Sequence, residues 1–300
     1  MAQLLQLVIN AVALGSLYAV VALSFEIAYE ATGVVNFATG QLVTIGALLG
    51  ASAVVYAGAH VGAGGTALQF ATAYGLVFAG MGVLGLLFFV GVFMPLRKQP
   101  VLTIIIGTIA IGIAIQNVAQ LVWGPLPIST LSPVGAGTLS IAGAVVSMHA
   151  LYTIAVSALL IGAVYLLLYR SALGSQLRAL AQDPEAARLM GIRVHRLYGL
   201  TWVLVCLLAG IAGLLLGPMW FIDVGIGDGV GLKAFAAAII GGFGSVPGAI
   251  IGGLLVGLAE MLGAAYISSA YKDAIVFALM FLFLLVRPQG LFGERVADRA

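Results

Sequence analysis

RSALGSQLRALAQDPEAARLMGIRVHR, residues 170–196, is the longest polar interval in a sequence that is otherwise almost continuously apolar. Asp183 can accept hydrogen bonds from the free amides of a first helical turn, and Pro184 suits the first helical position because its missing N–H costs nothing there. Gly191 can end a helix in the left-handed conformation. The interval therefore predicts a short helix over residues 184–190, which needs support from other structure because about seven residues are marginal alone in water. The apolar residues that can make such a contact are Ala186, Ala187, Leu189 and Met190.

The composition excludes an ordinary soluble protein. Of the 300 residues, 63% are hydrophobic and 7% are charged, and the mean hydropathy is +1.20. Soluble domains carry about a quarter charged residues. Apolar runs of about 20 residues are long enough to cross a bilayer. We therefore expect one all-α polytopic transmembrane domain over residues 1–300, with no cleaved secretory signal, because no basic residue precedes the first apolar run.

Nine apolar segments are expected to cross the membrane as a helix bundle. Lys and Arg in short loops mark the cytoplasmic side, so the loop with Arg97 and Lys98 and the interval 170–196 lie inside. This places the N-terminus outside and the C-terminal tail inside. The piece 232–243 has only about 12 residues, so it either crosses as a short helix or re-enters the membrane. The predicted spans are 4–28, 34–56, 67–94, 101–123, 151–169, 197–220, 232–243, 249–266 and 274–286.

Three charged residues lie beside or within these apolar segments. Glu26 and Glu30 are one helical turn apart near the end of the first span. A carboxylate inside hydrocarbon costs a few kcal/mol, so we expect both at the membrane interface in contact with water rather than in a polar interior. Lys233 is expected to extend toward the lipid headgroups. The alternative is that its ammonium attracts a substrate carboxylate at the outer mouth of a path.

Two glycine-rich segments, residues 36–40 and 241–248, interrupt the apolar pattern. Residues 11–51 and 206–255 share a similar pattern, an apolar run followed by a glycine-rich one. With the predicted topology they would start on opposite sides of the membrane. Broken segments at corresponding places of an inverted repeat indicate a substrate path near the membrane centre. The alternative is ordinary close packing of helices through small residues.

No enzyme signature is present, and no P-loop for ATP occurs anywhere in the chain. Cys206 is the single cysteine, and the three histidines have no ligand-like spacing, so we expect no catalytic residue, no metal and no cofactor bound by this chain. The predicted spans also lack the chains of acidic and basic residues that proton-coupled carriers use. An ion-coupled secondary carrier or channel remains an alternative, and a structural scaffold is disfavoured because broken glycine-rich segments cost stability.

Several stretches carry a resemblance to a known family. Glu185, Ala186, Ala187 and Gly191 reproduce the pattern EAA-x-x-x-G, which resembles the cytoplasmic loop by which bacterial ABC importer permeases engage their ATPase subunits. Over nearly the whole length, the chain is similar to the permease subunits of branched-chain amino acid ABC transporters, the LivH type. The stretches that carry this similarity are GSLYAVVAL, VVNFATG, TIAIGIAIQN, RALAQDPEAARLMGI, GLKAFAAAIIGGFGSVPGAIIGGLLVGLAE and YKDAIVFALMFLFLLVRPQGLFG.

The resemblance implies a multi-pass permease of the bacterial inner membrane, in contact with lipid and without a nucleic-acid partner. It also implies two cytoplasmic ATPases that hydrolyse the ATP, a periplasmic solute-binding protein, and a second permease that is either a paralogue or a second copy of this chain. Coupling to the ATPases is assigned to Asp183, Glu185, Ala186, Ala187, Arg188 and Gly191. The translocation path is assigned to Asn36, Phe37, Thr39, Gly40, Gln41, Gly241, Gly242, Gly244 and Ser245.

The chain departs from the family pattern around the expected path. Thr39 stands where a histidine is common, Gln41 stands where an acidic residue is common, and Glu26 and Glu30 replace neutral residues. The solute implied by the resemblance is a branched-chain or related amino acid. Urea or a short amide, or another small solute carried by this family, is the alternative.

Overall fold

The computed structural model describes residues 2–61, 66–141 and 143–293. Within these ranges the protein is mostly α-helical, which confirms the expected all-α membrane class. The structure adds one antiparallel hairpin, β1 (Thr138–Ile141) and β2 (Ala144–Ser147), in the loop that precedes α6. Because this loop has no charged residue, the hairpin is an uncharged cap on one end of the helix bundle.

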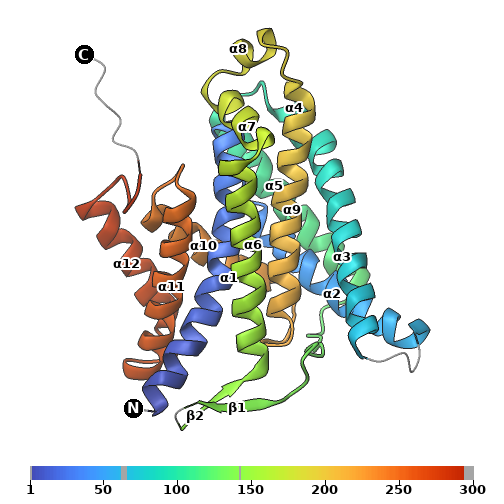
Figure 1. The fold of residues 1–300 in the computed structure, drawn as a ribbon. Helices are drawn as coiled ribbons and strands as arrows, with labels where there is room; N and C mark the ends of the chain where they lie inside the picture. The colour runs from blue at the N-terminus through green and yellow to red at the C-terminus, as the bar shows by residue number, and fades with distance from the viewer. Residues whose placement is uncertain (1, 62–65, 142, 294–300) are drawn as a thin grey trace.

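Seven helices of the described chain are long and apolar enough to span a bilayer. Two shorter helices, α10 (Ile226–Gly241) and α12 (Lys272–Val286), pack beside α11 (Figure 1). The third long helix includes a π-helical turn, η1 (Phe89–Phe93), between α3 (Thr66–Phe88) and α4 (Met94–Leu96). The other long helices are α1 (Ala2–Thr32), α2 (Thr39–Val61), α5 (Val101–Trp123), α6 (Met148–Arg170), α9 (Val194–Leu216) and α11 (Val246–Tyr266).

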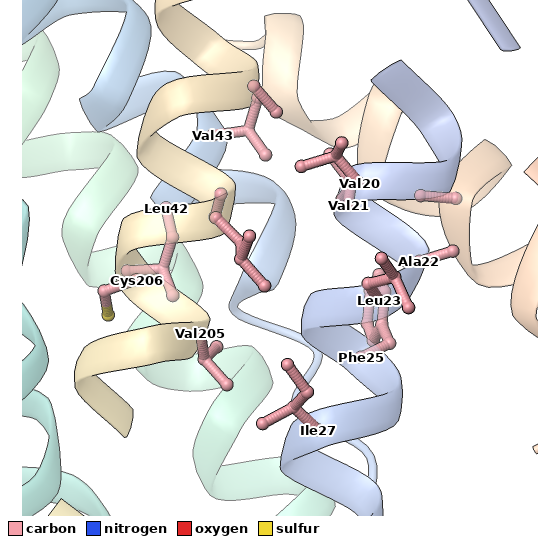
Figure 2. Packing of buried hydrophobic residues seen from close by; sticks show 14 of the residues in the cluster. Val20, Val21, Ala22, Leu23, Phe25, Ile27, Leu42, Val43, Val205 and Cys206 are labelled. Carbon is pink, nitrogen blue, oxygen red and sulfur yellow. The ribbon is translucent and has the colours of Figure 1, made fainter. Parts of the chain in front are cut away.

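The first helix, α1, is the centre of the bundle, and nearly all of its residues from Ala11 to Ala28 are buried. It packs against α6, α9, α10 and α11. Figure 2 shows the interior between α1, α2 and α9, where Val20 and Ile27 of α1 share one apolar cluster with Val43 of α2 and Val205 of α9. Because α1 is surrounded by other helices, most of its side chains contact protein rather than lipid.

Glycines allow the central helices to approach each other closely. A Cβ on Gly257 of α11 would collide with the backbone of Gly15 in α1, and a Cβ on Gly46 of α2 would collide with the backbone of Gly210 in α9. Small residues at helix crossings are typical of membrane bundles, in which dispersion contacts replace the hydrophobic driving force. These glycines therefore set the distances between α1 and α11 and between α2 and α9.

The polar interval 170–196 forms two helices rather than the single helix that the sequence predicts. The first is α7 (Ala172–Gln182), whose Leu177 and Leu180 are buried against the bundle. The second is α8 (Pro184–Leu189). Both lie at the end of the bundle opposite the hairpin and the N-terminal end of α1 (Figure 1). The prediction missed α7 although Leu173, Leu177 and Leu180 recur at helical spacing in the sequence.

Candidate coupling helix and translocation path

The start and end of α8 are fixed by its own sequence. The carboxylate oxygen Oδ1 of Asp183 accepts hydrogen bonds from the backbone N–H groups of Glu185 and Ala186, at 2.8 and 3.0 Å. Gly191 has a φ angle of +82°, which only glycine adopts without strain. The sequence-based prediction of a short capped helix is therefore confirmed, with its last residue at Leu189 instead of Met190.

The two faces of α8 differ sharply in exposure. Ala187 is buried, with 4% of its surface exposed, and it anchors the helix to the bundle. Leu189 and Met190 are 89% and 82% exposed. Glu185 and Arg188 are also exposed. Two large apolar side chains at the outer tip of a cluster of polar helices form a small surface that a partner protein can cover.

The break between α1 and α2 is held by local hydrogen bonds and by α5. Asn36 is buried, and its Oδ1 accepts a hydrogen bond from the N–H of Ala38 at 3.1 Å. The hydroxyl of buried Thr39 donates to the backbone oxygen of Asn36 at 2.8 Å. The N–H of Phe37 donates to Oγ1 of Thr108 in α5 at 3.2 Å. Non-helical backbone is tolerated at such a place because protein groups satisfy it.

A groove of about 390 Å³ lies where α2, α5 and α10 meet beside this break. The side-chain amides of Gln41 and Gln116 donate to the two carboxylate oxygens of Asp228, and the Gln116 bond measures 3.1 Å. Gly40 lies against Gly227 of α10 so closely that neither could carry a Cβ without a shift. The aromatic rings of the groove come from Phe25, Phe37 and Phe235.

Sequence reasoning did not assign Gln116 or Asp228 to this groove. The predicted spans leave Asp228 in the connection between 220 and 232, whereas the structure places it in the first turn of α10, because α10 begins at Ile226 rather than near residue 232. Gln116 is a polar residue within the apolar run of α5. It belongs to a group of polar residues with Asn117 and Gln120, and that group was the signal in the sequence that could have indicated it.

The second predicted path segment lies at the other end of α10. Gly241, Gly242 and Gly244 form the turn from α10 to α11, and Ser245 caps α11 by accepting a hydrogen bond from Gly248 N–H at 3.2 Å. Six residues of α10 separate Gly241 from Phe235, the last residue of this helix that lines the groove, or roughly 9 Å at 1.5 Å per residue. The structure therefore places the two segments on either side of Phe235, whose ring lies near Phe37 of one and Phe243 of the other.

A row of aromatic rings runs between the two segments. The ring of Phe37 lies 5.4 Å from that of Phe235, which lies 5.8 Å from that of Phe243. The ring of Tyr29 lies 5.0 Å from that of Phe243. These rings form a continuous apolar contact from the groove to the α10–α11 turn. A movement of one segment would therefore displace rings that contact the other.

The expectation for Glu26 was wrong. Its side chain is 1% exposed rather than solvated, and its Oε2 accepts a hydrogen bond from the N–H of Gly244 at 2.6 Å. The physical reason is that the α10–α11 turn covers this side of α1, which continues as a helix to Thr32. Glu30, one turn further along, is half-buried.

The expectation for Lys233 was also wrong. Its side chain is buried, and its Nζ lies 2.6 Å from Oε1 of Glu260 and 2.7 Å from Oδ1 of Asp273. The hydroxyl of Tyr18 donates to Oε2 of Glu260 at 2.6 Å. The sequence had suggested an interior without paired charges, and the structure shows that the interior contains them. The network joins α1, α10, α11 and α12, and it holds Lys233 away from the headgroups because oppositely charged partners are closer.

We predict that Glu260→Ala lowers the thermal stability of the purified protein strongly, by about 3–5 kcal/mol, because it leaves the Lys233 ammonium in the interior without its most buried partner. The double variant Lys233→Met with Glu260→Met should recover most of this loss, since Asp273 is partly exposed and stays solvated. Thermal unfolding in detergent measures both. A double variant as unstable as the sum of the single changes would contradict the pairing, and Asp223→Asn serves as the control.

Comparison with known proteins agrees with this architecture. The family model described as "Branched-chain amino acid transport system / permease component" matches residues 7–284. The high-affinity branched-chain amino acid transport system permease protein LivH of Escherichia coli is 35% identical over 310 residues, which cover 98% of this chain and 97% of LivH. The high-affinity branched-chain amino acid transport system permease protein BraD of Pseudomonas aeruginosa is 35% identical over 300 residues, which cover 98% of this chain and 97% of BraD.

A more distant match covers only part of the chain. The fructose import permease protein FrcC of Rhizobium meliloti is 34% identical over 117 residues, which cover 36% of this chain and 32% of FrcC. No solved structure matches the chain. Since the family model covers most of the chain and two relatives are aligned over nearly their whole lengths, this multi-pass membrane protein belongs to the family of permease components of branched-chain amino acid transport systems.

Proposed function

We propose that this protein is the membrane-spanning subunit of an ABC importer that moves branched-chain or related amino acids across the bacterial inner membrane. The observation that carries the proposal is α8, a capped helix that presents Leu189 and Met190 to the surroundings. A permease that hydrolyses no ATP needs a mechanical contact with the subunits that do. A short rigid helix anchored by Ala187 is suited to transmit such a push.

The proposed partners follow from the two ends and one side of the bundle. Two cytoplasmic ATPases bind the ATP and press on α8 and on its counterpart in a second permease, which is a paralogue or another copy of this chain. The second permease packs along α5, of which only Thr108, Gly112 and Ala119 are buried within this chain. A periplasmic solute-binding protein docks at the opposite end, near the hairpin.

The proposed topology has nine crossings, with the N-terminus outside and the C-terminus inside. The α7 and α8 helices and the Arg97–Lys98 loop carry basic residues at one end of the bundle, and the uncharged hairpin is at the other (Figure 1). The α10 helix has 16 residues, which span about 24 Å, less than the roughly 30 Å of a bilayer core. It can cross because α1, α2 and α11 surround it. At its start the N–H of Gly227 donates to Oγ1 of Thr44, and at its end the N–H groups of Leu291 and Phe292 donate to the backbone oxygens of Ile240 and Gly241.

The proposed path runs through the groove between α2, α5 and α10. The Asp228 carboxylate, held in place by two amides, can receive the ammonium group of an amino acid, and the rings of Phe37 and Phe235 can receive an aliphatic side chain. The groove opens along exposed residues of α5, so the second permease would close it.

Urea or a short amide is the second candidate, because the amides of Gln41 and Gln116 suit a neutral polar solute. Thermal-shift screening of the cognate binding protein separates the two. An ion-coupled carrier would instead transport solute when reconstituted without ATPases.

We predict that Leu189→Ser lowers ATP hydrolysis stimulated by loaded binding protein about tenfold in the reconstituted importer. Burial of a leucine side chain contributes about 1.5–3 kcal/mol to a contact, and the substitution removes it without affecting the bundle. Leu159→Ser is the matched control, because Leu159 is also exposed but lies on α6, far from either soluble partner. Unchanged stimulation in Leu189→Ser would contradict the coupling role of α8.

The topology gives a second prediction. Ser175→Cys should react with a membrane-impermeant thiol reagent only after the cytoplasmic side is opened, because Ser175 lies exposed on α7. Ser129→Cys, in the loop before the hairpin, should react in intact cells. The native Cys206 is fully buried and should not contribute. Labelling of Ser175→Cys from the outside would invert the proposed orientation.

The path gives a third prediction. Asp228→Asn should lower the maximal uptake rate of an amino acid about tenfold at saturating binding protein, because it removes the charge that faces the ammonium group. Asp223→Asn is the control, since Asp223 is also exposed but does not line the groove, and its carboxylate accepts the N–H of Gly225. Equal uptake rates in the two variants would exclude Asp228 from the path.

A further inference from the structure

A second hollow, distinct from the groove, lies beneath α8. Its volume is about 560 Å³, and its walls come from α8, α9, the α3–η1–α4 helix, α5 and the segment between α1 and α2. Asn36 lines this hollow and not the groove, whereas Phe37 lines the groove and not the hollow. The two adjacent residues therefore form a partition between an outer groove and an inner cavity.

The inner cavity contains two hydrogen-bond donors without acceptors. Asn36 and Trp202 both line it, and both side chains are nearly fully buried. Nδ2 of Asn36 and Nε1 of Trp202 have no hydrogen-bond partner among the described residues. A buried donor without a partner is costly, and native proteins keep few of them. Both nitrogen atoms are covered in the structure, so a small shift of these side chains would bring them to a ligand in the cavity, whose acceptor atoms would then supply the missing partners.

The mouth of the cavity is positively charged. Arg97 and Lys98 from the loop before α5 and Arg188 from α8 line it, with one carboxylate, that of Glu185. None of these four residues forms an ion pair within the described parts of the chain. Opposed to this rim, the deeper wall is apolar and aromatic, with Phe88, Phe93 and Val92 among its residues. The combination suits an anion that carries an apolar body.

We propose that this inner cavity is a binding site, open to the cytosol, for a small carboxylate with an aliphatic side chain. The rim cations attract the carboxylate, the N–H groups of Asn36 and Trp202 receive its oxygens, and the apolar wall receives the side chain. The carboxylate of Glu185 can pair with an ammonium group of the same molecule. The choice of an amino acid as this carboxylate rests on the proposed function.

Such a site would report the cytosolic concentration of the imported solute. A bound molecule would touch α8 through Glu185 and Arg188, and it would touch the partition through Asn36. A ligand that binds one arrangement of two elements better than another shifts the equilibrium toward that arrangement. Bound solute would therefore hold α8 against the partition and slow the ATP-driven cycle.

The test uses the importer assembled with its ATPases, without binding protein, and L-leucine as the probe. Saturable binding of radiolabelled L-leucine is expected. Trp202→Phe should weaken it about tenfold, because an aromatic side chain is retained while the N–H that bonds to a charged acceptor is lost. Trp123→Phe is the matched control, since Nε1 of Trp123 donates to Oγ of Ser52 outside the cavity. Arg97→Gln should also weaken leucine binding, and because Arg97 lies at the rim, this substitution leaves the packing of the interior unchanged.

Three outcomes would overturn the proposal. The first is the absence of saturable binding at millimolar leucine. The second is that Trp202→Phe and Arg97→Gln bind leucine as well as the parent protein does. The third is that Gln116→Leu loses binding while those two variants keep it, which would place the leucine in the groove. If phosphatidylglycerol displaced all bound leucine, the cavity would be assigned to a lipid phosphate, and the proposal of an amino acid ligand would be overturned. When loaded binding protein is then added to the same preparation, stimulation of ATP hydrolysis tests the proposed importer function separately from the proposed cavity site. Stimulation without leucine binding at the cavity would overturn the cavity site alone.

Discussion

In the interior of a bilayer no water is available, so a buried polar group must find its partner within the protein. The central helix, α1, shows how this bundle meets that requirement. Glu26 accepts a hydrogen bond from Gly244 N–H in the turn between α10 and α11, and Tyr18 donates to Glu260, which also pairs with Lys233. Tyr18 and Glu26 thus link α1 to α11 and to the turn between α10 and α11. These links orient the half of the molecule that forms the groove.

Close approach of backbones is the second requirement, because dispersion forces decay steeply with distance. Glycines at the crossings of α1 with α11 and of α2 with α9 supply it. At the crossing of α2 with α10, the contact between Gly40 and Gly227 also fixes Gln41 beside Asp228. The same close contact that stabilises the bundle therefore builds the polar part of the groove. Packing and the proposed path cannot be varied independently at this place.

The partition at Asn36 and Phe37 connects the two hollows of the molecule. Its backbone is held by Thr108 of α5, and its aromatic ring is in contact with Phe235 of α10. A shift of α5 or α10 would therefore reach the partition directly. Because the inner cavity is also lined by α8, a push on α8 has a short physical route to the same residues. This arrangement connects the end of the bundle that carries α8 to the break between α1 and α2 without a long chain of contacts.

The sequence by itself determined the membrane class, the approximate positions of the long helices, and the cap and stop of α8, because hydropathy and capping depend on residues near each other in the chain. The resemblance added the family. Only the tertiary structure placed Lys233 against Glu260, Glu26 against Gly244, and Asp228 against Gln116. These partners are separated by 27, 218 and 112 residues, and a hydropathy pattern carries no information on which distant polar groups will meet. The cavity beneath α8 is likewise a product of packing, since its walls come from five separate parts of the chain.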